Sequence, residues 1–262
     1  MLITPQYPVS PGTMTRNAST AEHPQFWKGL VGSWGASIDP SAHDLSGYGN
    51  DGSFVSAVTN TRTLGIACWD FVGSGDYIDT GAPVVPAGDW TVMAWINPDV
   101  SQVQDIIGQW KSASAARFEF AHFSGVMNIY IGGSQIAFSS ASPTVGAWTH
   151  CAATRRGSAI TMYMNGVADG TGSSSQTIEQ DTTTTIGTLS VATVTQDYNG
   201  QISDVLISGN AWNASDIAKH YRLTSQDRTA WARRKQLFIP HAPAAAPAGG
   251  NPWNYYAQQG AA

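Results

Sequence analysis

The stretch WDFVGSGDYIDTGAPVVPAGDWTVMAWINP, residues 69–98, decides the fold class. A Gly-Ser-Gly turn at 73–75 separates an apolar run from a short strand around Tyr77, and a longer strand follows after a Pro- and Gly-rich loop. That longer strand alternates, with Trp90, Val92, Ala94 and Ile96 on one face and Thr91, Met93, Trp95 and Asn97 on the other. Both faces carry large apolar groups, which is typical of a central strand covered on both sides.

The composition of the chain is compatible with one large β domain or two small ones, since β sandwiches often reach this length. Only 12% of the 262 residues are charged, about half the usual share, and Gly, Ser and Thr are abundant instead. A surface of hydroxyls and amides is common in virion and extracellular β proteins. This composition favours such a protein without identifying one.

Charge is distributed unevenly along the chain. Residues 30–210 hold 15 acidic and 5 basic side chains, a net of −10, whereas residues 211–262 hold 2 acidic and 6 basic ones, a net of +4. The basic stretch 219–235 is short and lacks interleaved stacking aromatics, which argues against nucleic acid as its partner. We expect it to dock onto an acidic protein.

Three further features of the sequence bear on the cellular location and the redox state of the protein. The first residues, MLITPQYPVSPG, have neither the basic nor the apolar region of a secretory signal, and no apolar run reaches the length of a membrane span. Cys68 and Cys151 fall in predicted strands without metal-site spacing. We expect two buried thiols rather than a disulfide or a zinc site.

Short strands with turns between them recur along the rest of the chain. A first strand is expected at 26–34, and later candidates lie at 105–110, 117–122, 127–131, 135–139, 147–155, 159–165, 184–188 and 200–208. Arg156-Gly157 and Asn165-Gly166 are hairpin turns, the second of a type that tolerates positive φ. The spacing predicts an all-β sandwich or jelly roll without βαβ units.

Helical and extended segments flank the predicted sandwich. Asn213 can cap a helix from Ala214 to about Tyr221, which would pack Ile217 on the sandwich, and a second short helix is expected at 229–238. We assign 1–25 to an extended N-terminal arm, 26–222 to the β domain and 223–262 to a C-terminal arm, basic at first and then rich in Pro, Ala and Gly.

Several motifs, in a fixed order, carry a resemblance to a known family. They are LVGSW, DLSGYGNDGSF, WDFVGSGDYIDTG, DWTVMAWINPD, VGAWTHCAATRRGSAITMYMNG and GQISDVLISGNAWNASDIAKHY. Through these motifs, the region 28–222 resembles the laminin-G-like domains of the concanavalin A-like lectin/glucanase superfamily. The resemblance implies a jelly roll of two curved antiparallel sheets with a short helix at its end. The flanking pieces HPQFWKGLVGSW and GGNPWNYYAQQ look like those of proteins from tailed bacteriophages and environmental bacteria.

Because this superfamily includes glycosidases, catalytic carboxylates are the first kind of site to consider. Hydrolysis of a glycosidic bond needs two carboxyl groups across the sugar, and enzymes of this fold place them at alternate positions of one strand. Glu119, in ARFEFAHF, has no acid two positions away on either side. Asp76 and Asp79 belong to a motif that also occurs in non-catalytic relatives. We therefore expect no enzyme.

A structural calcium ion is the cofactor to consider, although we assign none. Asp44, the loop carbonyls of 47–50 and a carboxylate in the last strand would supply oxygen ligands. Many relatives carry Asp at the position of Ser203, next to Asp204, so this chain departs from the family's pattern there.

Carbohydrate binding would need an exposed aromatic platform, for which Trp95, Trp110, Tyr130 and Trp148 are available, although most Trp in such a fold belong to the core. The apolar side of Met93 and Trp95 would be covered by an arm of the chain or by a neighbouring subunit. The residues expected to meet a protein partner are Trp253, Tyr255, Tyr256, Arg233, Arg234, Met93 and Trp95.

These observations predict a non-catalytic structural, decoration or adhesion protein of a tailed phage, held by its terminal arms on capsid or tail proteins, with the lectin-like sandwich exposed. Self-association and a host glycan remain open as partners, and no membrane is expected. The alternative is a carbohydrate-binding module of a cell-surface or secreted protein. The expected location is the virion, or otherwise the cytoplasm or the cell surface.

Overall fold

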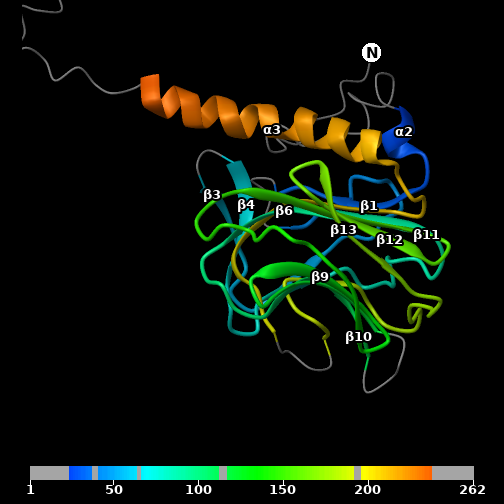
Figure 1. Ribbon diagram of the computed structural model, residues 1–262. Coiled ribbons are helices and arrows are strands. Elements are labelled where there is room, and N and C mark those ends of the chain that lie inside the picture. The colour runs from blue at the N-terminus through cyan, green and yellow to red at the C-terminus, as the bar shows by residue number, and fades with distance from the viewer. Residues whose placement is uncertain (1–23, 37–40, 64–65, 112–116, 192–195, 238–262) are drawn as a thin grey trace, which may run out of the picture.

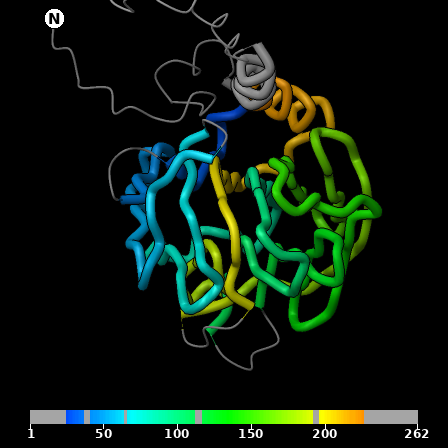
Figure 2. The backbone as a smooth tube through the Cα atoms, turned by 90° about the vertical axis from the view of Figure 1, so that its left-hand side faces the viewer, coloured from blue at the N-terminus to red at the C-terminus, as the bar shows by residue number. Residues whose placement is uncertain are grey.

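The computed structural model describes residues 24–36, 41–63, 66–111, 117–191 and 196–237, with side chains up to Ser225. The expected arms at 1–23 and 238–262 lie outside the described residues. Within them the chain forms two antiparallel sheets packed face to face, with helix α3 (Ala214–Leu237) lying along the outer side of one sheet (Figures 1 and 2). The predicted all-β sandwich of jelly-roll type is confirmed.

The first sheet has eight strands and the second has seven. In spatial order the first sheet contains β13 (Val167–Ser173), β12 (Ala159–Met164), β11 (Thr149–Arg156), β6 (Trp90–Pro98), β15 (Asn199–Ser208), β4 (Ile66–Val72) and β3 (Thr59–Thr63), and β1 (Leu30–Trp34) also pairs with β15. The second sheet contains β10 (Ser134–Phe138), β9 (Val126–Ile131), β8 (Phe118–Phe123), β7 (Gln104–Gln109), β14 (Thr185–Ile186), β5 (Tyr77–Asp79) and β2 (Ser53–Val55).

Strand β6 lies at the centre of the first sheet, between β11 and β15, and all nine of its residues are buried. Trp90, Val92, Ala94 and Ile96 face the core between the two sheets, as the alternation of the sequence predicts. Met93 belongs to a second, smaller core on the outer side of the same sheet. The strand is therefore covered on both faces, as expected.

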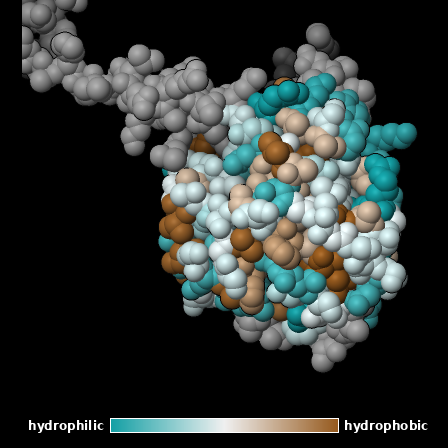
Figure 3. Space-filling view, viewed as in Figure 1, coloured by the Kyte–Doolittle hydropathy of each residue, from teal (hydrophilic) through white to brown (hydrophobic). Residues whose placement is uncertain are grey.

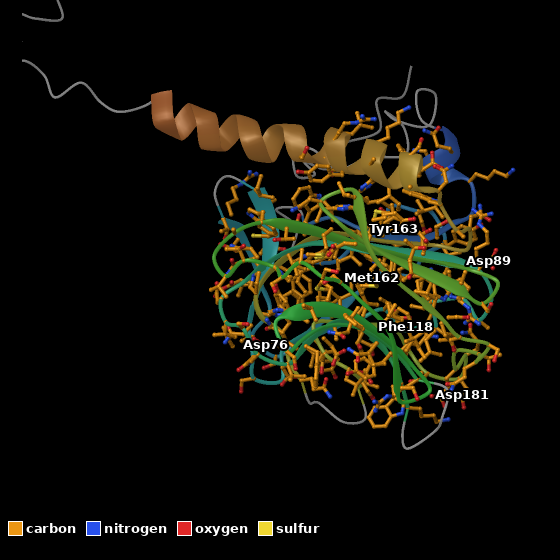
Figure 4. All side chains as sticks on the ribbon, viewed as in Figure 1. Asp76, Asp89, Phe118, Met162, Tyr163 and Asp181 are labelled. Carbon is orange, nitrogen blue, oxygen red and sulfur yellow. The ribbon has the colours of Figure 1, made fainter. Side chains whose placement is uncertain are left out.

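The second core is formed by helix packing on the outer face of the first sheet. Met93, Ala152, Tyr163 and Leu206 come from the sheet, Leu30 from β1, and Phe26, Trp212 and Ile217 from the segments that cross over it. Figure 4 shows Tyr163 on the side of α3, whereas its neighbour Met162 points toward the second sheet. Successive residues of β12 thus pack alternately into the two cores.

The residues predicted to form a hairpin turn and a helix cap do so in the structure. Asn165 and Gly166 have φ of 49° and 79°, which is the conformation of a tight hairpin between β12 and β13. The Asn213 side chain accepts a hydrogen bond from the Asp216 amide at 2.9 Å, as an N-cap does. Cys68 and Cys151 are buried free thiols, also as expected, and burial raises the pKa of the Cys151 thiol.

The ends of the domain differ from the expectation in two respects. Phe26 lies in a helical turn, α2 (Pro24–Trp27), and the first strand begins only at Leu30. A single helix runs from Ala214 to Leu237, through the expected domain end at 222, instead of two short ones. No Gly or Pro occurs within it, so nothing in the sequence stops the helix after its cap. None of the described helices is long and apolar enough to span a bilayer.

The packing of α3 on the sheet generates a stability prediction. Met93 is fully buried between β6 and the helix, so Met93→Ala should lower the free energy of unfolding by about 2–5 kcal/mol. Val167→Ala, at a strand position that is 68% exposed, should change it by no more than about 0.5 kcal/mol. Urea unfolding measures both. Equal, small effects would mean that the outer face of the first sheet is open.

Candidate functional site

Two of the residues expected to meet a partner, Met93 and Trp95, lie beneath the chain's own helix. Trp95 is 3% exposed, its indole N–H donates to the Thr224 hydroxyl at 3.0 Å, and its ring stacks on that of Tyr221 with centroids 5.7 Å apart. The cover is therefore α3, which begins in the region assigned to the β domain and continues into the assigned C-terminal arm, and neither side chain is on an open surface for a second protein.

The other predicted docking residues are not placed by the structure. Trp253, Tyr255 and Tyr256 lie outside the described residues. Arg233 and Arg234 belong to the last turns of α3, and their side chains also lie outside the described part. Their role in docking stays a prediction.

The loop expected to supply calcium ligands uses its carboxylate internally. Asp44 accepts four hydrogen bonds, from the Ser33, Ser46 and Asn50 amides and from the Ser46 hydroxyl, at 2.7–3.1 Å. Four donors use the acceptor capacity that a cation would need. Within the described ranges, no three His, Cys, Asp or Glu side chains gather as a metal site, and Asp204 lies separately, at a positive-φ position where the pairing of β15 with β6 is irregular.

The outer face of the second sheet, turned away from the first sheet, brings together polar and aromatic groups. Glu119, on β8, forms an ion pair with Arg117 at 2.7 Å. Asp105 lies on the same face of the neighbouring strand β7, because it pairs with Ala121, two residues from Glu119. The family's catalytic pattern places the second acid on the same strand as Glu119, whereas here the second acid, Asp105, lies on the neighbouring strand.

An irregularity in β7 aims Asp105 at this face. Asp105 pairs with Ala121 and Ile107 with Phe120, so Ile106 is an extra residue between two successive pairs. Ile106 and Ile107 are both buried in the main core, although simple alternation would send one of them outward. Such a bulge re-aims a side chain, and bulges are common beside functional sites.

Four planar side chains cross three neighbouring strands of this face, and we call them the aromatic–arginine ladder. The Arg117 guanidinium lies 5.8 Å from the ring centre of Trp110 and 5.9 Å from that of Tyr130, and the Tyr130 and Phe123 rings are 6.0 Å apart. All four are partly exposed. Trp110 and Tyr130 are two of the four aromatics that the sequence offered as a sugar platform, whereas Arg117 and Phe123 were not foreseen.

Polar atoms without hydrogen-bond partners concentrate next to the ladder. They are both carboxylate oxygens of Asp105, Trp110 Nε1, Arg117 Nε and Glu119 Oε1, the last two forming a close ion pair that is not aligned as a hydrogen bond. Buried polar atoms in folded proteins are almost always paired, so each such atom requires an explanation. Five of them at one place indicate a site for a ligand or ordered water.

Burial also controls the protonation of this cluster. The side chain of Asp105 is fully buried, and this desolvation, with the nearby Glu119 charge, raises the pKa of Asp105 well above its ordinary value. Burial raises the pKa of Glu119 as well, but the Arg117 guanidinium opposes that rise. Burial therefore favours the neutral form of Asp105 more strongly than that of Glu119.

One side of the face is bounded by the chain segment that follows β14. A Cβ atom on Gly108 would lie 2.2 Å from the Leu189 carbonyl oxygen, so the backbone of 188–189 crosses directly over β7 at this point. Asp197, at the end of this segment, accepts from the Thr188 hydroxyl at 2.8 Å. The side seen in Figure 3 shows small scattered hydrophobic groups rather than one continuous apolar patch.

Comparisons with known proteins agree with this architecture. A family model described as "Concanavalin A-like lectin/glucanases superfamily" (Laminin_G_3) matches residues 72–218, more than half of the chain. No curated protein matches the sequence.

Solved structures with a similar fold include the binding domain of Paraclostridial Mosquitocidal Protein 1, with a TM-score of 0.61 and 15% identity over 75% of this chain and 52% of that one. Domain 4 of a GH43 extracellular arabinanase from Geobacillus stearothermophilus has a TM-score of 0.61 and 16% identity over 73% of this chain and 98% of that domain. The botulinum neurotoxin serotype D binding domain gives 0.59 and 15%, over 76% and 52%.

These identities show a shared fold. The chain spans about half of the length of the toxin domains and nearly all of the arabinanase domain.

The unpaired Asp105 generates a pH prediction. Because its pKa is raised in the folded state, the folded chain keeps a proton that the unfolded chain releases, so stability falls as pH rises from the ordinary Asp range through the raised pKa. Asp105→Asn removes that loss and should unfold at a higher urea concentration than the wild type at pH 7, with a smaller difference near pH 4.

Asp76→Asn is the matched control. Asp76 is equally buried, but its two oxygens accept the Ala57 and Val72 amides at 2.8 and 2.9 Å, so losing one of these bonds should cost about 1–3 kcal/mol. If Asp105→Asn destabilised the fold as much as Asp76→Asn does, Asp105 would be a structural residue.

Proposed function

Because the chain belongs to the Laminin_G_3 family of the concanavalin A-like lectin/glucanases superfamily, we propose that it is a non-catalytic carbohydrate-binding module. Its ligand site is the outer face of the second sheet, centred on the aromatic–arginine ladder. The observation that carries this proposal is the combination of partly exposed rings with three unpaired polar atoms, the two Asp105 oxygens and Trp110 Nε1, and the misaligned Arg117–Glu119 ion pair beside them.

The ladder has the composition of a sugar site. Such sites combine aromatic surface with a few polar groups that fix orientation. Trp110 and Tyr130 supply flat surface for the apolar face of a sugar ring, and Arg117 and Glu119 supply the polar contacts. Among the solved structures of similar fold, the arabinanase domain is in complex with arabinotriose, and others are receptor-binding domains, which supports the same kind of role here.

Burial of the acids favours binding over hydrolysis. A glycosidase needs two carboxyl groups that both reach the scissile bond. Asp105 is 0% exposed and Glu119 2% exposed, and Glu119 is held by Arg117. Neither carboxyl group lies open to a glycosidic oxygen, so we assign no catalytic role to the pair.

The proposal predicts that the ladder rings carry affinity. Trp110→Ala and Tyr130→Ala should each weaken glycan binding about tenfold, which corresponds to about 1.4 kcal/mol of lost contact. Tyr48→Ala removes an aromatic side chain that is 69% exposed on a loop away from this face and should leave binding unchanged. Isothermal titration with the strongest ligand from a glycan array measures all three. Unchanged affinity in both ladder variants would exclude this site.

For the setting of the module we propose a tailed-phage particle, with the described domain outward and the terminal segments on capsid or tail proteins. The low charge of the chain and the likeness of its flanking segments to phage proteins support this setting. A host glycan is then the natural ligand of the exposed face.

Mass spectrometry of purified particles tests the setting. The polypeptide should be present, and a chain lacking residues 240–262 should fold and fail to incorporate. Particles without the polypeptide would refute the virion role. Normal incorporation of the truncated chain would refute docking through the C-terminal segment.

A further inference from the structure

We propose that the ligand of the aromatic–arginine ladder is an uncharged, polyhydroxylated glycan segment, and that the site discriminates against sugars that carry a carboxylate. This inference rests on the proposed function and names its ligand class. An arginine between two rings would by itself suggest an acidic sugar, and three features of the site argue against one.

The first feature is the mixture of unpaired donors and acceptors. Trp110 Nε1 and Arg117 Nε are donors, Glu119 Oε1 is an acceptor, and the Asp105 carboxyl accepts and, when protonated, also donates. A sugar hydroxyl both donates and accepts, so neighbouring hydroxyls can satisfy both kinds of atom. A ligand carboxylate only accepts, so it would serve the donors and leave Glu119 Oε1 without a donor.

The second feature is that the positive charges here are already balanced. Glu119 lies 2.7 Å from Arg117, and a ligand carboxylate at that guanidinium would meet the Glu119 charge. The other cation, Lys111, is paired with Asp181 at 3.0 Å, and its backbone N–H donates to Glu179 at 3.3 Å. Around the ladder the nearby acids therefore outnumber the bases, which makes a further negative charge unfavourable.

The third feature is the state of Asp105. Burial favours the protonated form of Asp105, which offers one O–H donor and further acceptor capacity and again matches a hydroxyl. Tyr130 and Asp197 are the other titratable groups that act on this cluster, and Asp197 adds negative charge. A bound carboxylate would bring one more charge into a poorly solvated place, with no free cation among the described groups facing it.

Access to Arg117 Nε and Glu119 Oε1 requires the Arg117 side chain to move. The five polar atoms are covered, but the Arg117 side chain is 25% exposed and is held by ring contacts and a misaligned ion pair. Side-chain rotation at a binding surface is common and leaves the backbone in place. Arg117 is thus the movable element, and Glu119 is the residue that sets the charge preference.

The test uses the full chain and a panel of neutral oligosaccharides, each paired with an acidic counterpart of the same linkage. Suitable pairs are β-1,4-mannotetraose with β-1,4-tetramannuronate, and desialylated with sialylated biantennary glycans. We expect neutral members to bind at least tenfold more tightly than their partners, and Trp110→Ala to remove that binding.

Two variants separate local from overall charge. Glu119→Gln removes the local negative charge and should reduce the preference for neutral ligands about tenfold. Asp89→Asn makes the same change in net charge at the end of the first sheet, where its carboxylate accepts the Gly157 amide, and should leave the preference unchanged. If Glu119→Gln does not fold, the wild-type preference across the paired panel decides alone.

The outcomes are distinguishable. Acidic members binding as tightly as neutral ones, or more tightly, in a manner sensitive to Trp110→Ala, would overturn the ligand class and leave the proposed function intact. A folded Glu119→Gln variant with an unchanged preference would overturn the charge argument. No binding to any member of the panel would overturn the proposed function together with this inference.

Discussion

The two-sided burial of β6 is the constraint on which the rest of the structure depends. Nine consecutive buried residues need apolar cover above and below the strand. The second sheet supplies it on one side, and α2, α3 and the segment before α3 supply it on the other through Phe26, Ile217 and Trp212 respectively. The outer face of the second sheet is not covered by these helices, and there the partly exposed rings of Trp110, Phe123 and Tyr130 lie beside buried acids. The candidate site forms on that face.

The structural features that depend on a local sequence pattern can be predicted from the sequence. Alternation in 90–97 predicts a central strand, Asn165-Gly166 a hairpin and Asn213 a helix start, and all three are found. The candidate site depends instead on the register between strands. Asp105 and Glu119 meet only because β7 bulges at Ile106, and Arg117 lies between Trp110 and Tyr130 only after three strands are aligned. No periodicity encodes such a bulge, so the sequence of one strand shows one acid where the folded face has two.

The role of each acidic residue in this domain follows from its hydrogen-bond partners rather than from its residue type. Asp44 accepts four hydrogen bonds and Asp76 two, and each holds a loop or turn together. Asp105 is equally deep and has no side-chain hydrogen bond within the described structure. A buried unpaired carboxyl group lowers stability, so its presence beside partly exposed aromatic rings is understandable if the cluster serves binding. The same reasoning separates Trp110, whose indole N–H is unpaired, from Trp95, whose N–H is bonded beneath α3.

The most direct test of the central claim is a titration of the uniformly ¹⁵N-labelled protein with a neutral oligosaccharide, followed through the indole N–H resonances of its ten Trp residues. The Trp110 resonance should shift and saturate with the affinity measured by calorimetry. The Trp95 resonance, from beneath α3, should stay in place. A saturable shift at Trp95 with none at Trp110 would place the ligand on the other sheet and contradict this account.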